Sequence, residues 1–169
     1  EISEISQKNK RSKKIERLAE SWPELLAYYQ LLRTDYAAVK KSIPKHPLLE
    51  MSLAGELNTY ALFAELAARL TEKDGFAAII VKSALVMSTC YSRFFRSCVH
   101  NGTLSEVFLF DNREKIFQID SREKFCVLFF DGKQDRGLRV HYGLTGKEQV
   151  RSSVPVRIEA EELELINPE

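Results

Sequence analysis

The fold is decided by residues 104–130, LSEVFLFDNREKIFQIDSREKFCVLFF, in which two apolar runs flank a polar connection. The runs 104–110 and 124–130 have the length of strands and are rich in Phe, Leu and Val. The connection 111–123 contains no apolar pattern long enough for a helix. Because parallel neighbours need a crossover connection, we expect the second strand to run antiparallel to the first.

A further strand is predicted upstream at residues 76–81, FAAIIV. It is apolar at consecutive positions, which is typical of a central parallel strand buried on both faces. Residues 83–101 follow with a helical pattern, and a helix between two strands indicates a parallel crossover. The predicted fold is therefore α/β, with two parallel strands and one reversed strand beside or between them. The side chains expected to face inward from the crossover helix are Leu85, Cys90, Phe94, Phe95 and Cys98.

Two more helices are predicted before this sheet. From Trp22, apolar residues recur at three- and four-residue steps until Pro44 and Pro47 end the helix. The clearest helix covers residues 56–72, and Asn58 is its predicted N-cap, with a side chain that accepts a free backbone N–H. Its predicted apolar stripe is Leu57, Tyr60, Phe63, Leu66, Ala67 and Leu70.

The two ends of the chain are more polar. Residues 133–153 are expected to be irregular apart from an edge strand at 138–142, followed by a short strand at 154–158 and a short acidic helix at 159–166. Residues 1–21 contain a basic cluster that can touch phosphates. A solvated helix or arm is the favoured interpretation, because Glu16 and Glu20 dilute the positive charge.

The composition bounds the class of protein. With 169 residues, 44% of them hydrophobic, and a net charge of +1, the chain can bury a core but gives no global case for nucleic acid. Three cysteines without CxxC spacing argue against a disulfide framework and a zinc site. The longest apolar run is far too short to span a bilayer, and no signal peptide is visible, so a cytoplasmic location is expected. A first residue other than Met indicates a piece of something longer.

Three stretches carry a resemblance to a known family. They are GELNTYALFAE at 55–65, GFAAIIV at 75–81 with Ser83 following, and FDNREKIF at 110–117, continuing through DSR at 120–122 to Lys124-Phe125. Their order and spacing resemble the gamma-type adenine-N6 DNA methyltransferases, above all the large enzymes of type IIG restriction–modification and related phage-defence systems. The resemblance covers roughly residues 22–168.

The resemblance implies a division of the chain into three parts. Residues 55–132 would be the C-terminal half of a Rossmann-like methyltransferase domain, whose sheet has parallel strands plus one antiparallel strand. A helical segment, residues 1–54, would precede it. Residues 133–169 would extend toward a target-recognition region, since the tail Leu165-Ile166-Asn167-Pro168 resembles the point where the family's enzymes make that passage.

The resemblance also implies site residues. In the family, the Phe of an Asn-x-Tyr-x-x-Phe segment lies against the adenine of S-adenosylmethionine, and Phe63 matches it, with Asn58 and Tyr60 as weaker candidates. An aromatic ring just before the reversed strand stacks on the flipped target adenine, and Phe117 matches it. The alternatives are that Phe63 is only a core residue and that Phe117 only caps the core. We expect the two rings to line neighbouring compartments of one cleft.

Charged residues around Phe117 allow two interpretations. The carboxylates of Asp111, Glu114, Asp120 and Glu123 can bind Mg²⁺, but the interleaved cations favour a solvated mixed-charge loop. Among those cations, Arg113 and Lys115 are predicted to meet DNA phosphate beside the ring. No metal site is predicted, since His46, His100 and His141 are scattered, and no GxSxG elbow supports a hydrolase. One departure from the family is Lys82, where Pro often follows the strand.

The catalytic motifs of the family do not occur in this sequence. It contains no GxG for the donor-binding turn, and its only Asn-Pro, at 167–168, is followed by Glu169 rather than by the Asn/Asp-Pro-Pro-aromatic tetrad. We therefore predict no catalytic residue in this chain and no activity without the remainder of the polypeptide or a complementary chain. Double-stranded DNA is the expected substrate, and an exposed half-sheet is expected to self-associate. The alternative is a non-catalytic module that binds DNA or protein.

Overall fold

The computed structural model describes residues 2–53, 57–133 and 137–166, the last three of these by their backbone alone. The chain divides into two compact units, Glu1–Lys45 and His46–Glu169. No helix in the described part of the chain is long and apolar enough to cross a membrane.

The first unit is helical. It contains α1 (Lys8–Glu16), α2 (Leu18–Ser21), α3 (Pro23–Ser42) and a 3₁₀ turn, η1 (Ile43–Lys45). Pro23 occupies the first turn of α3, where its fixed φ suits a helix and its missing N–H costs nothing. The predicted stop is confirmed, because α3 ends at Ser42 and Pro44 lies in η1. None of the residues in these elements is buried.

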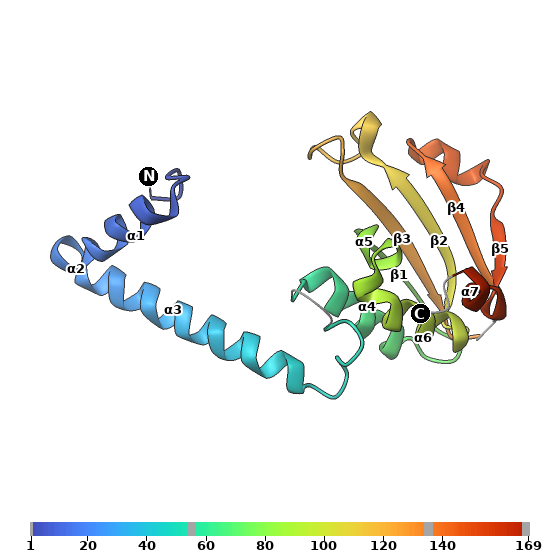
Figure 1. The fold of residues 1–169 in the computed structure, drawn as a ribbon, viewed down its shortest axis with the longest axis horizontal. Coiled ribbons are helices and arrows are strands. Elements are labelled where there is room, and N and C mark those ends of the chain that lie inside the picture. The colour runs from blue at the N-terminus through green and yellow to red at the C-terminus, as the bar shows by residue number, and fades with distance from the viewer. Residues whose placement is uncertain (1, 54–56, 134–136, 167–169) are drawn as a thin grey trace. The chain divides into compact units, whose positions relative to one another are not determined.

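The second unit is built on one sheet of five strands in the order β1-β3-β2-β4-β5 (Figure 1). β3 pairs antiparallel with both β1 and β2 and lies between them. The predicted reversed strand is thus confirmed, and β1 and β2 point in the same direction. The protein is an α/β fold with a mixed sheet. The strands are β1 (Phe76–Lys82), β2 (Leu104–Asp111), β3 (Lys124–Asp131), β4 (Gly137–Leu144) and β5 (Val156–Glu159).

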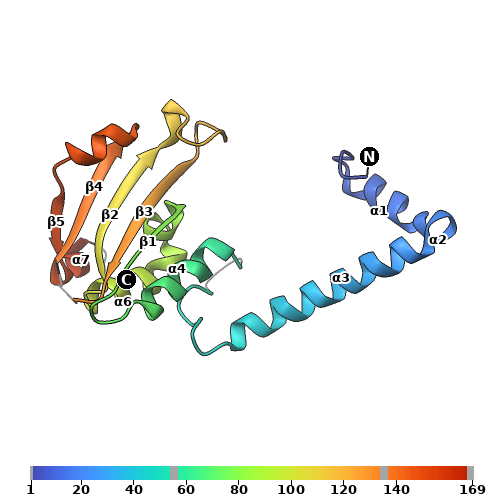
Figure 2. The same cartoon turned by 180° about the vertical axis from the view of Figure 1, so that it is seen from behind.

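The prediction that residues 76–81 form a central strand covered on both faces is wrong. β1 is an edge strand of the described sheet and pairs with β3 alone (Figure 2). Its side chains alternate in burial, and Phe76 and Ile80 are 64% and 56% exposed. A continuous apolar run indicates that both faces are apolar, but the described residues cover only one of them.

The prediction of an irregular segment with an edge strand at 133–153 also needs correction. β4 lies inside the sheet, parallel to β2 and antiparallel to β5. Its polar residues are accommodated by hydrogen bonds, because His141 Nε2 lies 3.0 Å from Glu106 Oε1 and His141 Nδ1 lies 2.7 Å from Ser153 Oγ. The His141 ring stacks on Phe108 at 4.1 Å between centroids. A polar sequence can therefore occupy an interior strand.

The predicted helix 83–101 is broken into α5 (Ala84–Met87), a 3₁₀ turn, η2 (Thr89–Tyr91), and α6 (Ser92–His100). The break falls at Ser88, whose backbone is extended and whose hydroxyl accepts a hydrogen bond from the backbone N–H of Cys90. Leu85, Phe94 and Cys98 are buried as expected, whereas Cys90 is exposed. The crossover from β1 to β2 is preserved despite the break.

The helices of this unit pack on one face of the sheet. α4 (Thr59–Leu70), α5, α6 and α7 (Ala160–Ile166) all contribute to one core with the inward side chains of the strands. The other face holds a second, smaller core built around Phe108, Phe110, Phe125 and Leu144. Within the described residues, no helix contributes to that second core.

The face of α4 differs from the predicted stripe. The buried residues of the helix are Ala61, Leu62, Ala64 and Glu65, while Phe63 and Leu70 are 61% and 67% exposed. Small side chains at 61 and 64 let the helix pack closely on the sheet, and this rotates the larger side chains outward. Asn58 is at the N-cap position, but its side chain makes no capping hydrogen bond.

Candidate functional site

β1, β2 and β4 point in the same direction, so their carboxyl ends meet at one end of the sheet. Ligands of open α/β sheets bind in the crevice outside these ends. Here the end of the sheet is bordered by Ser83 after β1, by the loop 112–123 after β2, and by Thr145 after β4.

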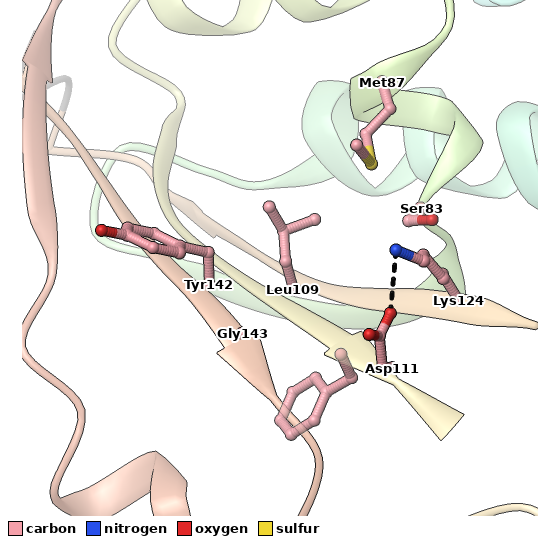
Figure 3. Close-up of a pocket in the computed structure, with 8 residues that line it drawn as sticks. Ser83, Met87, Leu109, Asp111, Lys124, Tyr142 and Gly143 are labelled. Carbon is pink, nitrogen blue, oxygen red and sulfur yellow. Dashed lines mark ion pairs between the residues drawn. The ribbon is translucent and has the colours of Figure 1, made fainter. Parts of the chain in front are cut away.

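A pocket of about 170 Å³ opens at this end (Figure 3). An ion pair between Lys124 Nζ and Asp111 Oδ1, 3.0 Å apart, forms its charged wall. Apolar side chains supply most of the remainder, and Gly143 adopts a positive φ of 73°. The volume lies below the range of about 300–1,000 Å³ that is typical of drug-sized ligands, so the pocket has room for a single small group. Its lining is Ser83, Met87, Leu109, Phe110, Asp111, Lys124, Tyr142 and Gly143.

The loop 112–123 is organised by Asn112, which is fully buried. Its Nδ2 donates to the carbonyl of Phe117 at 2.9 Å, and its Oδ1 accepts from the backbone N–H of Phe117 at 3.0 Å. The backbone N–H of Asn112 donates to the carbonyl of Glu123 at 3.2 Å. One buried side chain therefore fixes the backbone at Phe117 and closes the loop at its base.

The ring of Phe117 is fixed by contact with another ring but remains partly exposed to solvent. It packs edge-on against Phe125 at 4.9 Å between centroids, and Phe125 stacks on Phe110 at 4.8 Å. The residue is 38% exposed. Phe117 thus does extend the second core, as the capping alternative proposed, and still leaves part of its surface open to solvent.

A shallow basic hollow lies beside this loop. Arg113, Arg122 and Lys124 line it together with Asp111 and Ser121. The Arg113 side chain is 76% exposed, and its Nε lies 3.4 Å from Asp111 Oδ2. Arg113 and Lys124 are paired with Asp111, and Arg122 is paired with Asp120, so a phosphate at this hollow would compete with these ion pairs.

Lys115, the other predicted phosphate contact, forms its hydrogen bond within its own loop. Its backbone is left-handed, with φ of 58°, and its ammonium donates to the carbonyl of Ile119 at 3.0 Å. The side chain folds back on its own loop and does not line the basic hollow.

The four carboxylates considered for Mg²⁺ are each engaged by a different partner. Asp111 pairs with Lys124, Asp120 with Arg122, and Glu123 with Lys82. Glu114 accepts a hydrogen bond from the hydroxyl of Thr145 at 2.8 Å. Hydrogen bonds from Arg122 lower the pKa of Asp120. Among the described residues, no group of three or more metal-binding side chains is arranged to hold an ion.

The candidates for the donor side lie on and just before α4. Asn58 Nδ2 donates to the hydroxyl of Tyr91 at 3.1 Å, and the hydroxyls of Tyr60 and Tyr91 are 3.2 Å apart. Desolvation, followed by the bond to Tyr91, raises the pKa of Tyr60 well above its ordinary value. Asn58 and Tyr60 thus tie α4 to the crossover segment. Phe63 is 61% exposed, so it is not a core residue of this chain.

The structure does not bring Phe63 and Phe117 into one cleft. α4 packs on the face of the sheet that carries the main core, and Phe117 packs against the opposite face through Phe125. Neither ring lines the pocket or the basic hollow. The described residues therefore do not support the prediction that the two rings line neighbouring compartments of one cleft.

Glu65 is a buried residue whose role the apolar pattern could not reveal. Its carboxylate is fully buried and accepts hydrogen bonds from the backbone N–H groups of residues 50–52, from Ser52 Oγ at 2.6 Å and from Arg69. Desolvation acts to raise its pKa, but the hydrogen bonds from Ser52 and the backbone outweigh it and lower the pKa. The predicted apolar stripe did not include Ala61, the residue one helical turn before Glu65, so the sequence pattern did not indicate that this face is buried.

Known proteins resemble this chain in structure and not in sequence. No protein-family profile and no curated protein matches the sequence. Among solved structures, a cryo-EM structure of a DrdV–DNA complex is similar over 73% of this chain, with a TM-score of 0.47 and 17% sequence identity. The matched part is 15% of the length of that chain.

Proposed function

We propose that this chain is the C-terminal part of an adenine-N6 DNA methyltransferase domain of a restriction–modification or phage-defence system. The methyl donor would be S-adenosylmethionine, and the acceptor would be an adenine flipped out of duplex DNA. The proposal rests on the resemblance of three ordered sequence stretches within residues 22–168. A reversed strand between two parallel strands agrees with the sheet that this resemblance implies.

The observation that supports the proposal most is the setting of Phe117. Its backbone is held by a buried Asn112, and its ring is half-exposed beside the end of a parallel strand. An enzyme that flips a base must replace the lost stacking, and an aromatic contact is worth about 1–3 kcal/mol per base. A ring that is positioned in advance and open to solvent suits that role. Arg113, in the adjacent basic hollow, would contact a phosphate of the same strand.

The residues present fit only one part of the methyl donor. The exposed ring of Phe63 can lie flat against the donor's adenine, although the described residues do not place this ring in one cleft with Phe117. The sequence contains neither a GxG turn for the rest of the donor nor the tetrad that orients the target amino group. We therefore expect the remainder of the polypeptide, or a complementary chain, to supply both. The edge strand β1, with exposed Phe76 and Ile80, is a suitable place for a further strand to pair.

A second candidate function follows from the missing motifs. A chain without a donor turn or a tetrad can serve as a non-catalytic module that binds DNA or a partner protein. The basic hollow of Arg113, Arg122 and Lys124 would then be the functional surface. The full gene separates the candidates, since an upstream donor turn and tetrad would favour the enzyme.

A methyl-transfer assay tests the proposal. The polypeptide that the whole gene encodes should form N6-methyladenine in duplex DNA, and the 169 residues alone should not. Phe63→Ala should raise the KM for the donor by about 2- to 10-fold, from an aromatic contact of about 0.5–1.5 kcal/mol. Leu70→Ala is the matched control, because Leu70 is 67% exposed on the same helix.

Two results would count against the proposal or a part of it. Robust turnover by the 169 residues alone would contradict their dependence on a further segment. A whole-gene product that binds DNA but forms no N6-methyladenine would favour the non-catalytic module.

A further inference from the structure

The first helical unit contains a groove of about 560 Å³ that belongs to no part of the proposed adenine site. Residues of the N-terminal segment, α1 and α2 and the residue that precedes α3 line this groove. The Nε of Arg11 donates to the carbonyl of Ile5 at 3.1 Å and so ties the N-terminal segment to α1. Its lining is Ile2, Ile5, Lys10, Lys13, Lys14, Arg17, Leu18, Ser21 and Trp22.

The charged side chains that line this groove are all positive. Residues 8–17 contain six Lys and Arg and a single carboxylate, Glu16. Four of the six cations line the groove, and Glu16 does not. They are spaced by three, one and three residues, which places them on one helical face. Among the described residues of this unit, no ion pair neutralises these four cations.

We infer that this groove binds the phosphodiester backbone of DNA at Lys10, Lys13, Lys14 and Arg17. The cations extend along about 10 Å of helix axis, at 1.5 Å per residue. Duplex DNA presents about six phosphate charges over that length, so the groove matches a polyanion better than a single small anion. The site is independent of methyl transfer and does not rest on the proposed function.

Trp22 gives the groove an aromatic side as well as a charged one. It is 66% exposed and lies next to the first turn of α3, where Pro23 fixes the backbone. An exposed ring beside a row of cations is suited to contact with sugars or an unpaired base at the edge of the bound strand. It is also the only tryptophan in the chain, so its fluorescence reports on the groove alone.

The test is a titration of the full 169-residue chain with a labelled DNA duplex, followed by both DNA anisotropy and Trp22 fluorescence. Single-stranded DNA of equal length, inorganic triphosphate and anionic lipid vesicles are the comparison ligands. The groove variant is Lys10→Gln/Lys13→Gln/Lys14→Gln/Arg17→Gln. The control removes equal charge from the same unit, outside the groove. It is Arg33→Gln/Lys40→Gln/Lys41→Gln/Lys45→Gln.

The wild-type chain should bind the duplex with a change in Trp22 emission. Loss of four phosphate contacts should reduce the slope of log K against log salt by about 3.6, since each contact contributes about 0.9. The control variant should keep most of the affinity and all of the fluorescence change. A charge-preserving variant, Lys10→Arg/Lys13→Arg/Lys14→Arg, should bind as wild type, and circular dichroism should show equal helix content in all variants.

The inference is overturned if the control variant loses as much affinity as the groove variant, or if DNA binds without any change in Trp22 emission. Equal competition by triphosphate, or binding to anionic vesicles but not to DNA, overturns it as well. Tighter binding of single-stranded DNA than of the duplex would show that the groove prefers an unpaired strand, and the assignment of the groove to DNA would stand. Failure of this site leaves N6-methyladenine formation untouched, so the two proposals fail separately.

Discussion

The two amphipathic helices α3 and α4 look alike in sequence and differ in the structure. α3 is 20 residues long and contains no buried residue, and Trp22 before it and Tyr36 within it are 66% and 72% exposed. α4 is only 12 residues long and buries Ala61, Leu62, Ala64 and Glu65. The number of large apolar residues therefore does not decide which helix belongs to a core. Small residues that allow close approach, and a buried carboxylate that finds donors, decide it here.

Because of this difference, we expect the stability of the sheet unit to depend little on α3. The sheet unit holds both apolar cores, whereas no residue within the elements of the first unit is buried. Helices in proteins gain most of their stability from packing an apolar face against the rest of the fold. We therefore expect substitutions on α3 to leave the unfolding of the sheet unit almost unchanged, and substitutions around α4 and its sheet to change it strongly.

The largest expected effect is that of Phe130→Ala. Phe130 is fully buried in the main core, and loss of such a ring costs about 3–5 kcal/mol. Leu32→Ala on α3 is the contrasting variant, because Leu32 is 48% exposed and its loss should change the free energy of unfolding by less than about 0.5 kcal/mol. Urea denaturation of both variants measures the difference. Equal losses of stability would contradict the difference between α3 and α4.

Glu65→Gln should have the next largest effect. The substitution keeps the shape of the side chain but removes charge-assisted hydrogen bonds worth about 1.5–3 kcal/mol. Because the pKa of Glu65 is lowered, its stabilising effect is complete above the ordinary carboxyl pKa and is lost as the pH falls through the lowered pKa. Wild type and variant should thus differ most at neutral pH and converge in acid. Curves that stay parallel from pH 7 to pH 3 would contradict the assigned network.

The smallest expected effect concerns thiol reactivity and leaves stability unchanged. Burial raises the pKa of Cys98 and of Cys126 to about 12, while Cys90 is exposed. Only a thiolate reacts readily, so one thiol per chain should be alkylated quickly at pH 8. Ala27→Cys on α3 should add a second fast thiol, since Ala27 is exposed. A slow thiol at residue 27 would show that α3 is covered.

The sequence predicted the existence and type of most elements. The apolar runs 104–110 and 124–130, with no helix between them, correctly predicted the reversed strand β3. The sequence could not predict which faces of the strands are covered by other parts of the chain. The run at 76–81 is apolar on both faces, but in the described part of the chain one face of β1 is exposed at Phe76 and Ile80. Burial of an apolar face depends on partners elsewhere in the chain, and local periodicity does not contain that information.

Polar residues account for the remaining differences between the predictions from the sequence and the structure. β4 lies inside the sheet because Glu106, on a neighbouring strand, satisfies His141, and this pairing is remote in sequence. The break at Ser88 depends on a side-chain hydrogen bond to the backbone that competes with the helix. At the candidate site, Phe117 and Arg113 stay predictions from the sequence, and the sequence did not point to Asn112, which holds the loop at Phe117.

The most direct test of the central claim compares Phe117→Ala with Ile119→Ala in the product of the whole gene. Both side chains are exposed in the same loop, but only the ring at 117 is proposed to stack on the flipped adenine. Loss of about 1–3 kcal/mol of stacking should lower kcat/KM for DNA methylation by about 5- to 150-fold in Phe117→Ala. Ile119→Ala should stay within about twofold of wild type, and Phe117→Trp should retain most activity. Equal rates for Phe117→Ala and Ile119→Ala would contradict the account.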